Sequence, residues 1–236
     1  MLGDGTGRVI HLGERDCSVQ RRYQKLIEET PAPGLSETLR GALHAAAVRF
    51  AERLSYRGAG TVEFLVDRTR EAFYFLEMNA RIQVEHPVTE AITGVDVVAE
   101  QIWIAEGNRL RIAQEDVVLA GHAIECRINA EDWADGFRPN PGTVTTAVFP
   151  AGPGIRVDTH VQAGSSVPPW YDSLLAKLIV SGRDRAEALG RLRAALARCE
   201  IGGVATTLGL HEKLAASPEF EAGGVDTGFL ERWLHG

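Results

Sequence analysis

The chain has 236 residues, of which 44% are hydrophobic, so it can bury the core of one large domain or two small ones. Its formal net charge is −7, and no basic block is concentrated enough to indicate nucleic-acid binding. The sequence has no long apolar run and no secretion signal, and its three cysteines are far apart, so we expect a cytoplasmic protein with reduced thiols and no membrane span.

The N-terminal region predicts a tight turn at residues 4–7, a strand at 8–12 and a helix at 20–29. A turn so close to the start of the chain indicates that a preceding strand is missing and that the domain is truncated. Pro31 and Pro33 end the predicted helix. Ser36 then caps a long amphipathic helix whose apolar residues follow helical spacing.

Residues 60–66 and 72–78 predict an antiparallel hairpin with a turn near Thr69. Its folding places Glu63 nearly opposite Glu77, and facing Cβ atoms in such a ladder are about 5 Å apart. Like charges repel at that distance unless a cation lies between them. Mg²⁺ prefers oxygen ligands and bridges carboxylates to nucleotide phosphates, so we expect Glu63, Glu77 and Asn79 to bind a metal. The alternative is that a neighbouring arginine neutralises the pair.

Polar and apolar residues alternate without a break from Glu77 to Glu85. In an extended strand, one face would carry Glu77, Asn79, Arg81, Gln83 and Glu85. The ordinary interpretation is the solvated face of a half-buried strand. This face has no Lys or Thr, however, and its carboxylates, amides and guanidinium could hold a divalent cation at one end and a small oxyanion farther along.

Farther along the chain, His86-Pro87 favours an extended or turn conformation, and Asp96 caps a helix that ends at Gly107. Asp184 caps another helix. The remaining predicted elements are strands at about 120–129, 143–149, 155–161 and 174–180, and helices at about 206–216 and 227–234. Strands before helices predict an α+β fold, which we divide into residues 1–115 and 116–236.

Five stretches of the sequence resemble the biotin carboxylase family of ATP-grasp enzymes. They are residues 14–25 (ERDCSVQRRYQK), 58–64 (GAGTVEF), 77–90 (EMNARIQVEHPVTE), 125–132 (ECRINAED) and 168–173 (PPWYDS). The resemblance implies the C-terminal part of an ATP-grasp domain, followed by a biotin carboxylase C-terminal domain with a mixed sheet and helices. In this family ATP activates bicarbonate as carboxyphosphate, and the carboxyl group passes to biotin on a carrier protein.

The resemblance also implies roles for individual residues. It makes Glu63, Glu77 and Asn79 the ligands of Mg²⁺ (or Mn²⁺) at the ATP phosphates, and Glu85 the general base. The implied bicarbonate-binding residues are Lys25, Arg81, Gln83 and Val84. The implied nucleotide-binding residues are Gln20, Tyr23, Leu65 and Glu77.

Two further arginines receive roles from the resemblance. Arg127 is similar to the residue that stabilises the biotin enolate, so it joins Glu85, Arg81 and Lys25 in the implied catalytic set. The alternative for Arg127 is a structural salt bridge to Glu125 or Glu131. Arg156 falls where the family places its dimer contact.

The sequence departs from the family in two respects. Tyr23 stands where many members have histidine, and the family's N-terminal domain, glycine-rich lid and phosphate-binding lysines have no counterpart here. We therefore expect a fragment that needs the missing N-terminal half for activity. Its expected partners are a biotin carboxyl carrier protein, a carboxyltransferase and a second copy, as in acyl-CoA carboxylases of fatty acid biosynthesis. The alternatives are an inert dimerisation module and a different ATP-grasp ligase.

Overall fold

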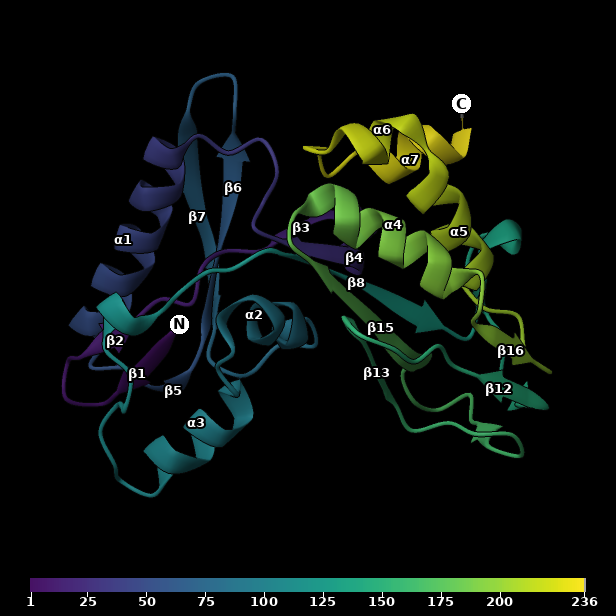
Figure 1. Cartoon of the computed structure of the whole chain (residues 1–236), viewed down its shortest axis with the longest axis horizontal. Helices are drawn as coiled ribbons and strands as arrows, with labels where there is room; N and C mark the ends of the chain where they lie inside the picture. The colour runs from purple at the N-terminus through teal and green to yellow at the C-terminus, as the bar shows by residue number, and fades with distance from the viewer. Residues whose placement is uncertain (236) are drawn as a thin grey trace. The chain divides into compact units, whose positions relative to one another are not determined.

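The computed structural model describes residues 1–235, which form two compact units (Figure 1). Unit 1 contains residues 1–16 and 30–120, and unit 2 contains residues 17–29 together with those from Gly121 onward. The division of the sequence at residue 115 places residues 17–29 in the first part, whereas in space they group with the second. Within residues 1–235, no helix combines the length and apolar character needed to cross a membrane.

Unit 1 begins with a small antiparallel sheet in the order β2-β1-β5. Its strands are β1 (Leu2–Asp4), β2 (Val9–Ile10) and β5 (Arg57–Ala59). The predicted turn at residues 4–7 is confirmed, because Asp4 Oδ1 accepts hydrogen bonds from the backbone N and the hydroxyl of Thr6 at 2.9 and 2.7 Å. The expectation that the strand before this turn is missing is wrong, because β1 precedes the turn and pairs with β2. The strand predicted at residues 8–12 is shortened to β2.

The helices of unit 1 begin at side-chain caps where the sequence predicted them. Helix α1 (Glu37–Arg53) starts after Ser36, whose Oγ accepts from Leu39 N at 3.2 Å. Helix α3 (Val97–Ala105) starts after Asp96, whose Oδ1 accepts from Ala99 N at 2.8 Å. Both caps satisfy backbone donors that have no partner inside the helix.

Helix α2 (His86–Thr93) was not predicted, because His86-Pro87 was interpreted as extended or turn-like. Pro87 lies in the first turn of the helix. There the missing N–H of proline removes no helical hydrogen bond, so proline can begin a helix.

The predicted hairpin is confirmed as β6 (Thr61–Asp67) and β7 (Ala72–Asn79). Its register pairs Glu63 directly with Glu77, and the ladder shifts between Glu63 and Phe64. Figure 1 shows this hairpin beside α1. The two predicted strands therefore bring the two carboxylates together.

The expectation of one polar face from Glu77 to Glu85 is wrong beyond Asn79. Strand β7 ends there because its partner β6 begins at Thr61, which pairs with Asn79. Residues 80–85 form bends and turns that lead into α2. As a result Gln83 and Glu85 are buried, whereas Arg81 is exposed.

Unit 2 is built on a five-stranded sheet in the order β13-β15-β8-β4-β3. The strands are β3 (Asp16–Arg21), β4 (Gln24–Thr30), β8 (His122–Asn129), β13 (Ile155–Thr159) and β15 (Leu174–Gly182). Helix α4 (Arg185–Leu196) packs on β15 and β8, and α5 (Leu208–Ala216) packs on α4, as Figure 1 shows. The core lies between these helices and the sheet and includes the fully buried Cys126.

The prediction of a helix at residues 20–29 is wrong. This segment forms the end of β3, the turn and most of β4 in the β3–β4 hairpin. The turn residues Arg22 and Tyr23 have positive φ angles of 47° and 68°. Non-glycine residues seldom adopt this conformation, so the sequence carries no ordinary hairpin signal here. Pairing with β8 overrides the helix propensity of a segment rich in Gln, Glu and Lys.

Unit 2 also contains three short ribbons, two short α-helices and a 3₁₀ helix at Trp133–Asp135. The ribbons pair β9 (Glu131–Asp132) with β10 (Arg138–Pro139), β11 (Gly142–Thr143) with β14 (Ser166–Val167), and β12 (Thr146–Val148) with β16 (Glu200–Gly202). The helices are α6 (Pro218–Ala222) and α7 (Phe229–His235).

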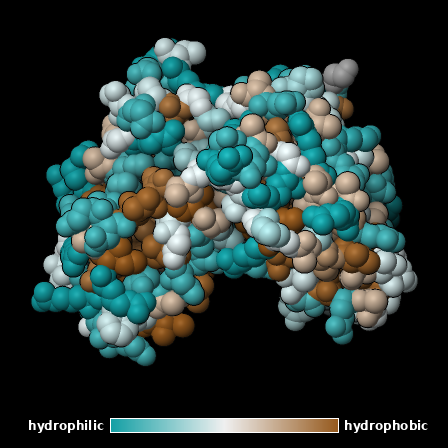
Figure 2. All heavy atoms as spheres, in the orientation of Figure 1, coloured by the Kyte–Doolittle hydropathy of each residue, from teal (hydrophilic) through white to brown (hydrophobic). Residues whose placement is uncertain are grey.

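Figure 2 shows that hydrophilic residues cover most of the face in view, while hydrophobic residues gather in separate patches. In unit 1, several apolar side chains of the β6–β7 hairpin remain about half exposed, namely Leu65, Tyr74, Phe75 and Leu76. Phe75 packs against Phe50 of α1 with 5.2 Å between ring centroids. The helix therefore covers only part of the apolar surface of the hairpin.

Candidate active site

The paired carboxylates of the hairpin are joined by one amide. Asn79 Nδ2 donates to Glu63 Oε1 at 3.2 Å and to Glu77 Oε1 at 2.9 Å. The ladder register holds both glutamates on one face, so the amide lies between two like charges. A rotation of the amide would turn its oxygen toward the same space, giving the two carboxylates and amide oxygen that suit Mg²⁺.

Histidine and cysteine take no part in this arrangement. Among residues 1–235, no group of three or more His, Cys, Asp or Glu side chains is placed to hold a metal ion. The two glutamates and Asn79 would thus need further oxygen ligands from water or from a phosphate. This is typical of Mg²⁺, which usually keeps several waters and binds through one or two carboxylates and substrate phosphates.

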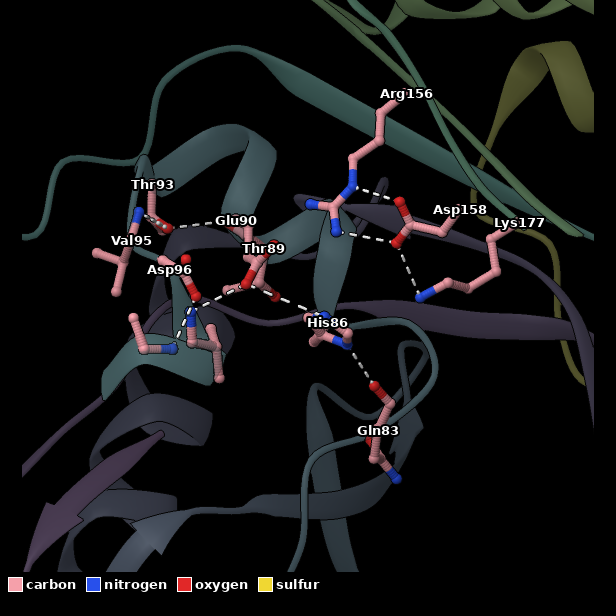
Figure 3. Close-up of polar contacts among 12 residues, drawn as sticks. Gln83, His86, Thr89, Glu90, Thr93, Val95, Asp96, Arg156, Asp158 and Lys177 are labelled. Atoms are coloured by element: carbon pink, nitrogen blue, oxygen red, sulfur yellow. Dashed lines mark hydrogen bonds and ion pairs between the residues drawn. The ribbon is translucent and has the colours of Figure 1, made fainter. Parts of the chain in front are cut away.

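Gln83 extends the carboxylate network and is held at both its side chain and its backbone. Its Nε2 donates to Glu63 Oε1 at 2.9 Å, and its side-chain Oε1 accepts from Arg15 at 3.0 Å. Figure 3 shows the backbone contact, in which His86 Nδ1 lies 2.8 Å from the Gln83 carbonyl oxygen. This contact places the proton on Nδ1 of His86, because a carbonyl oxygen can only accept.

The start of α2 places Glu85 in a buried position next to Gln83. Glu85 is the N-cap residue of the helix and is 2% exposed. The N-terminal end of a helix favours negative charge, which opposes the cost of burying a carboxylate. Farther along α2, Glu90 Oε1 accepts from Val97 N at 2.9 Å.

A small cavity of about 30 Å³ lies beside this network. Its polar lining includes Arg15, Arg81, Gln83 and His86. A cavity of this size holds one or two water-sized molecules. Two guanidinium groups and an amide offer donors to a small oxyanion at its rim.

Arg127 of unit 2 forms an ion pair that sequence reasoning did not anticipate. Its Nε and Nη2 lie 2.6 and 2.5 Å from Glu28 Oε1, and Glu28 is fully buried. The expected partners were Glu125 and Glu131, which are near Arg127 in sequence. Glu28 comes from the neighbouring strand β4 and was hidden in the segment predicted as a helix.

The backbone of Arg127 is held as firmly as its side chain. Its carbonyl oxygen accepts from His211 Nε2 at 2.7 Å and from Thr207 Oγ1 at 3.1 Å. His211 is completely buried, and this burial lowers its pKa to about 4 despite the hydrogen bond to the Arg127 backbone, which acts in the opposite direction. The imidazole is therefore neutral at pH 7.

The remaining nucleotide and bicarbonate candidates divide between the two units. Lys25 lies on β4 and is partly buried, and Gln20 on β3 donates to the Cys17 carbonyl at 3.1 Å. Tyr23 is 95% exposed in the β3–β4 turn. Leu65 on β6 is 51% exposed. Lys25, Gln20 and Tyr23 thus belong to unit 2, and Leu65 belongs to unit 1 with Arg81, Gln83 and Val84.

Arg156, the expected dimer contact, takes part in a second charged cluster of unit 2. It makes a bidentate contact with Asp158 at 2.7 and 2.9 Å, and Lys177 Nζ lies 3.3 Å from the same carboxylate, as Figure 3 shows. Partial burial alone would raise the pKa of Asp158, but the hydrogen bonds and charges of Arg156 and Lys177 lower that pKa below its usual value. The carboxylate is therefore ionised throughout the neutral range.

Comparison with known proteins assigns each half of the chain to a described domain. Residues 1–113 match the family described as "Carbamoyl-phosphate synthase L chain, ATP binding domain", and residues 125–232 match "Biotin carboxylase C-terminal domain". The chain is 56% identical over 231 residues to a biotin carboxylase of Nostoc sp. and 53% identical over 234 residues to one of Pseudomonas aeruginosa. These alignments cover 98% and 99% of the chain but 52% and 51% of the relatives.

The chain is also similar to solved structures of biotin carboxylase domains. The biotin carboxylase domain of a thermophilic 2-oxoglutarate carboxylase bound to bicarbonate is 49% identical, with a TM-score of 0.96 over 99% of this chain and 53% of that one. The corresponding domain dimer from Hydrogenobacter thermophilus, in complex with MgADP, ADP and bicarbonate, has the same identity and TM-score. The chain spans about half the length of the relatives that it matches.

Proposed function

Because the chain belongs to the biotin carboxylase family, we propose that it supplies the metal-, bicarbonate- and biotin-facing residues of an ATP-dependent biotin carboxylase. Turnover would also require the region that its relatives have outside the matched half. The reaction would couple cleavage of ATP to carboxylation of biotin on a carrier protein. The observation that carries this proposal is the network from Glu77 through Asn79 and Glu63 to Gln83.

In this proposal Glu63, Glu77 and Asn79 hold Mg²⁺ or Mn²⁺. The cation would neutralise the phosphate oxygens of ATP and the two paired carboxylates at once. Support comes from the register that sets the two glutamates opposite each other and from the relative whose complex contains MgADP. Leu65, Gln20 and Tyr23 would contact the nucleotide.

Bicarbonate would bind at Arg81, Gln83, the Val84 backbone and Lys25. A guanidinium pairs well with a planar oxyanion because its N–H groups form a fixed fork. Glu85 would take the proton of bicarbonate. The bicarbonate oxygen so freed would attack the terminal phosphorus of ATP, whose bond to the bridging oxygen would break so that ADP leaves and carboxyphosphate forms. The burial of Glu85 beside Gln83 supports this role, since a general base must be shielded and close to its substrate.

Arg127 would stabilise the negative charge that develops on the ureido oxygen of biotin. Its double contact with Glu28 and the fixed carbonyl behind it support this assignment, because electrostatic stabilisation depends on a charge that is already in place. Its partner in the ion pair does not exclude this role, since a guanidinium has five N–H donors.

The proposed partners are a biotin carboxyl carrier protein or domain, a carboxyltransferase and a second copy of the chain. The dimer of the Hydrogenobacter thermophilus relative supports self-association, and we assign Arg156 to that interface. The proposed location is the cytoplasm, where the three free cysteines would stay reduced.

A complementation assay tests the proposal. The chain is mixed with a separately expressed N-terminal half of the Nostoc relative, and bicarbonate-dependent ADP release is measured with MgATP and free biotin. We expect no release from either part alone and release on mixing. If mixing a stably associated pair gives no release, the chain is better described as an inert folded module. Release from the chain alone would contradict the requirement for the second part.

A further inference from the structure

We propose that Arg15 is a positioning residue that orients the side chains of Gln83 and Glu63, and this inference rests on the proposed function of that site. Arg15 lines the small cavity, but the resemblance assigns it no role in binding metal, nucleotide or bicarbonate. It lies between the small N-terminal sheet of unit 1 and Asp16, the first residue of β3.

The guanidinium of Arg15 joins three segments of unit 1. Its Nη1 donates to Thr89 Oγ1 of α2 at 2.9 Å, and its Nη2 donates to Thr61 Oγ1 of β6 at 3.0 Å and to Gln83 Oε1 at 3.0 Å. The strand that bears Glu63, the loop that bears Gln83 and the helix that follows Glu85 therefore share one donor group.

All three acceptors are neutral oxygens, which is unusual for a partly buried cation. Burying a charge among neutral groups costs free energy unless hydrogen bonds or a nearby opposite charge compensate. The Nε atom of Arg15 is also buried with no hydrogen-bond partner within the described residues. Packing alone does not explain a permanently charged side chain at this position, because methionine would fill the space without that cost.

The carboxylate of Glu63 provides the opposite charge, and the side-chain amide of Gln83 lies between it and Arg15. Gln83 accepts from Arg15 through Oε1 and donates to Glu63 through Nε2 at 2.9 Å. The amide therefore connects a cation to a carboxylate, and each hydrogen bond polarises the other. An amide rotated by 180° would turn its NH₂ group toward the guanidinium and its oxygen toward Glu63, so both contacts would become repulsive.

The arrangement thus selects one orientation of Gln83. With that orientation fixed, Glu63 keeps one oxygen engaged by Gln83 and Asn79. Bicarbonate would then meet a Gln83 amide that needs no reorganisation on binding, which is how a positioning residue aids an oxyanion site.

Side-chain NMR tests this inference without any assay of activity. The Gln83 amide pair of the full chain is assigned in a ¹H–¹⁵N spectrum by its loss in Gln83→Met, and its shift and solvent exchange are measured. We expect a displaced, slowly exchanging pair in the wild type. In Arg15→Lys and Arg15→Met the pair should move to the random-coil position and exchange at least about tenfold faster, as expected for loss of a charge-assisted hydrogen bond worth about 1.4 kcal/mol.

Arg111→Met is the matched control. Arg111 is also an arginine of unit 1 and pairs with the buried Glu100, but it makes no contact with Gln83. It should destabilise unit 1 while leaving the Gln83 amide signals in place. Arg15→Lys keeps the positive charge, so it can still be measured if Arg15→Met fails to fold. Unchanged Gln83 signals in a folded Arg15→Lys or Arg15→Met chain would overturn the inference.

A kinetic readout separates this inference from the proposed function. In the complemented enzyme, Arg15→Lys should raise KM for bicarbonate about tenfold with little change in KM for ATP. If complementation fails altogether, the proposed function falls while the NMR result still decides the role of Arg15. If the enzyme is active and KM for both substrates is unchanged in Arg15→Lys, the positioning role is wrong.

Discussion

At the scale of single residues, the proposed reaction separates side chains that would meet a substrate from side chains that hold other residues in place. Glu85 is of the first kind in the proposed reaction, and it sits buried at the start of α2. We expect Glu85→Gln to lower bicarbonate-dependent turnover of the complemented enzyme by about 100-fold or more, because the amide cannot accept the substrate proton. MgATP affinity, measured by calorimetry, should be unchanged, since the base acts on bicarbonate.

Glu90→Gln is the matched control for this prediction. Glu90 also belongs to α2, and its Oε1 accepts from Val97 N, a contact that an amide oxygen can replace. Its turnover should stay close to that of the wild type. Equal losses in the two variants would show that the effect of Glu85→Gln is structural.

His211 is of the second kind, and its pKa of about 4 predicts a dependence of stability on pH. The unfolded imidazole has a pKa near 6.5, so between pH 6.5 and 4 the unfolded chain binds more protons than the folded one. The unfolding free energy of unit 2 should therefore fall as the pH drops from 7 to 5, by about 2 kcal/mol from this group.

Urea unfolding at pH 7 and pH 5 checks this expectation. His211→Gln keeps an N–H that can donate to the Arg127 carbonyl but cannot be protonated, so it should lose this part of the pH dependence. Contributions from the other histidines are common to both proteins and cancel in the comparison. The same pH dependence in wild type and variant would contradict the assignment to His211.

Sequence reasoning predicted the pairing of Glu63 with Glu77 but missed the residues that hold Arg127 in place. The Glu63–Glu77 pair follows from strand alternation and the turn, both of which are local properties. Glu28 and His211 could not be found that way, because they reach Arg127 across sequence separations of 99 and 84 residues. No local pattern distinguishes a buried carboxylate that pairs with a distant arginine from a glutamate on a solvated surface.

At the scale of elements, the sequence predicted those whose signals are local. Ser36, Asp96 and Asp184 each mark a helix start with the expected hydrogen bond. Asp184 Oδ1, for example, accepts from Glu187 N at 2.8 Å. The β3–β4 hairpin was missed because its turn uses two non-glycine residues with positive φ and its strands are stabilised by β8. Propensity predicts an element only where no distant strand competes for its backbone.

The β6–β7 hairpin should respond to divalent cations as an element. A cation that binds the folded hairpin and not the unfolded chain stabilises unit 1, by about 1.4 kcal/mol at ten times its dissociation constant. Thermal unfolding should therefore shift upward when Mg²⁺ or Mn²⁺ is added. Glu77→Gln should remove most of this shift, because it removes one of the two facing carboxylates.

Glu71→Gln serves as the control for charge. Glu71 lies in the exposed turn of the same hairpin and carries the same charge away from Asn79. It should keep the full cation-dependent shift. A shift of equal size in Glu77→Gln and wild type would place the cation elsewhere.

At the scale of the whole molecule, the two units are interleaved along the chain. Unit 2 takes residues 17–29 from the middle of unit 1 and uses them as two of the five strands of its sheet. We expect a fragment of residues 121–236 to give a poorly dispersed NMR spectrum, because β8 loses its neighbour β4 and exposes unpaired backbone groups. Arg127, His122 and Arg185 also lose their partners Glu28 and Glu29.

Joining residues 16–30 to the same fragment through a Gly/Ser linker should restore a dispersed spectrum. A scrambled version of these residues is the control, since it has the same composition and length. A well-folded fragment 121–236 without the hairpin would contradict the view that β3 and β4 are structural parts of unit 2.

The place of the β3–β4 hairpin in the sequence also sets the order in which paired charges are synthesised on the ribosome. Glu28 and Glu29 emerge long before their partners, with Arg127 and His122 following 99 and 93 residues later and Arg185 following 156 residues after Glu29. At a synthesis rate of about 5–20 residues per second, these partners are made roughly 5 to 30 seconds after the two glutamates. Because burying an unpaired charge costs free energy, we expect the two carboxylates to stay hydrated during this interval and to enter the interior only after the groups that neutralise them have been synthesised.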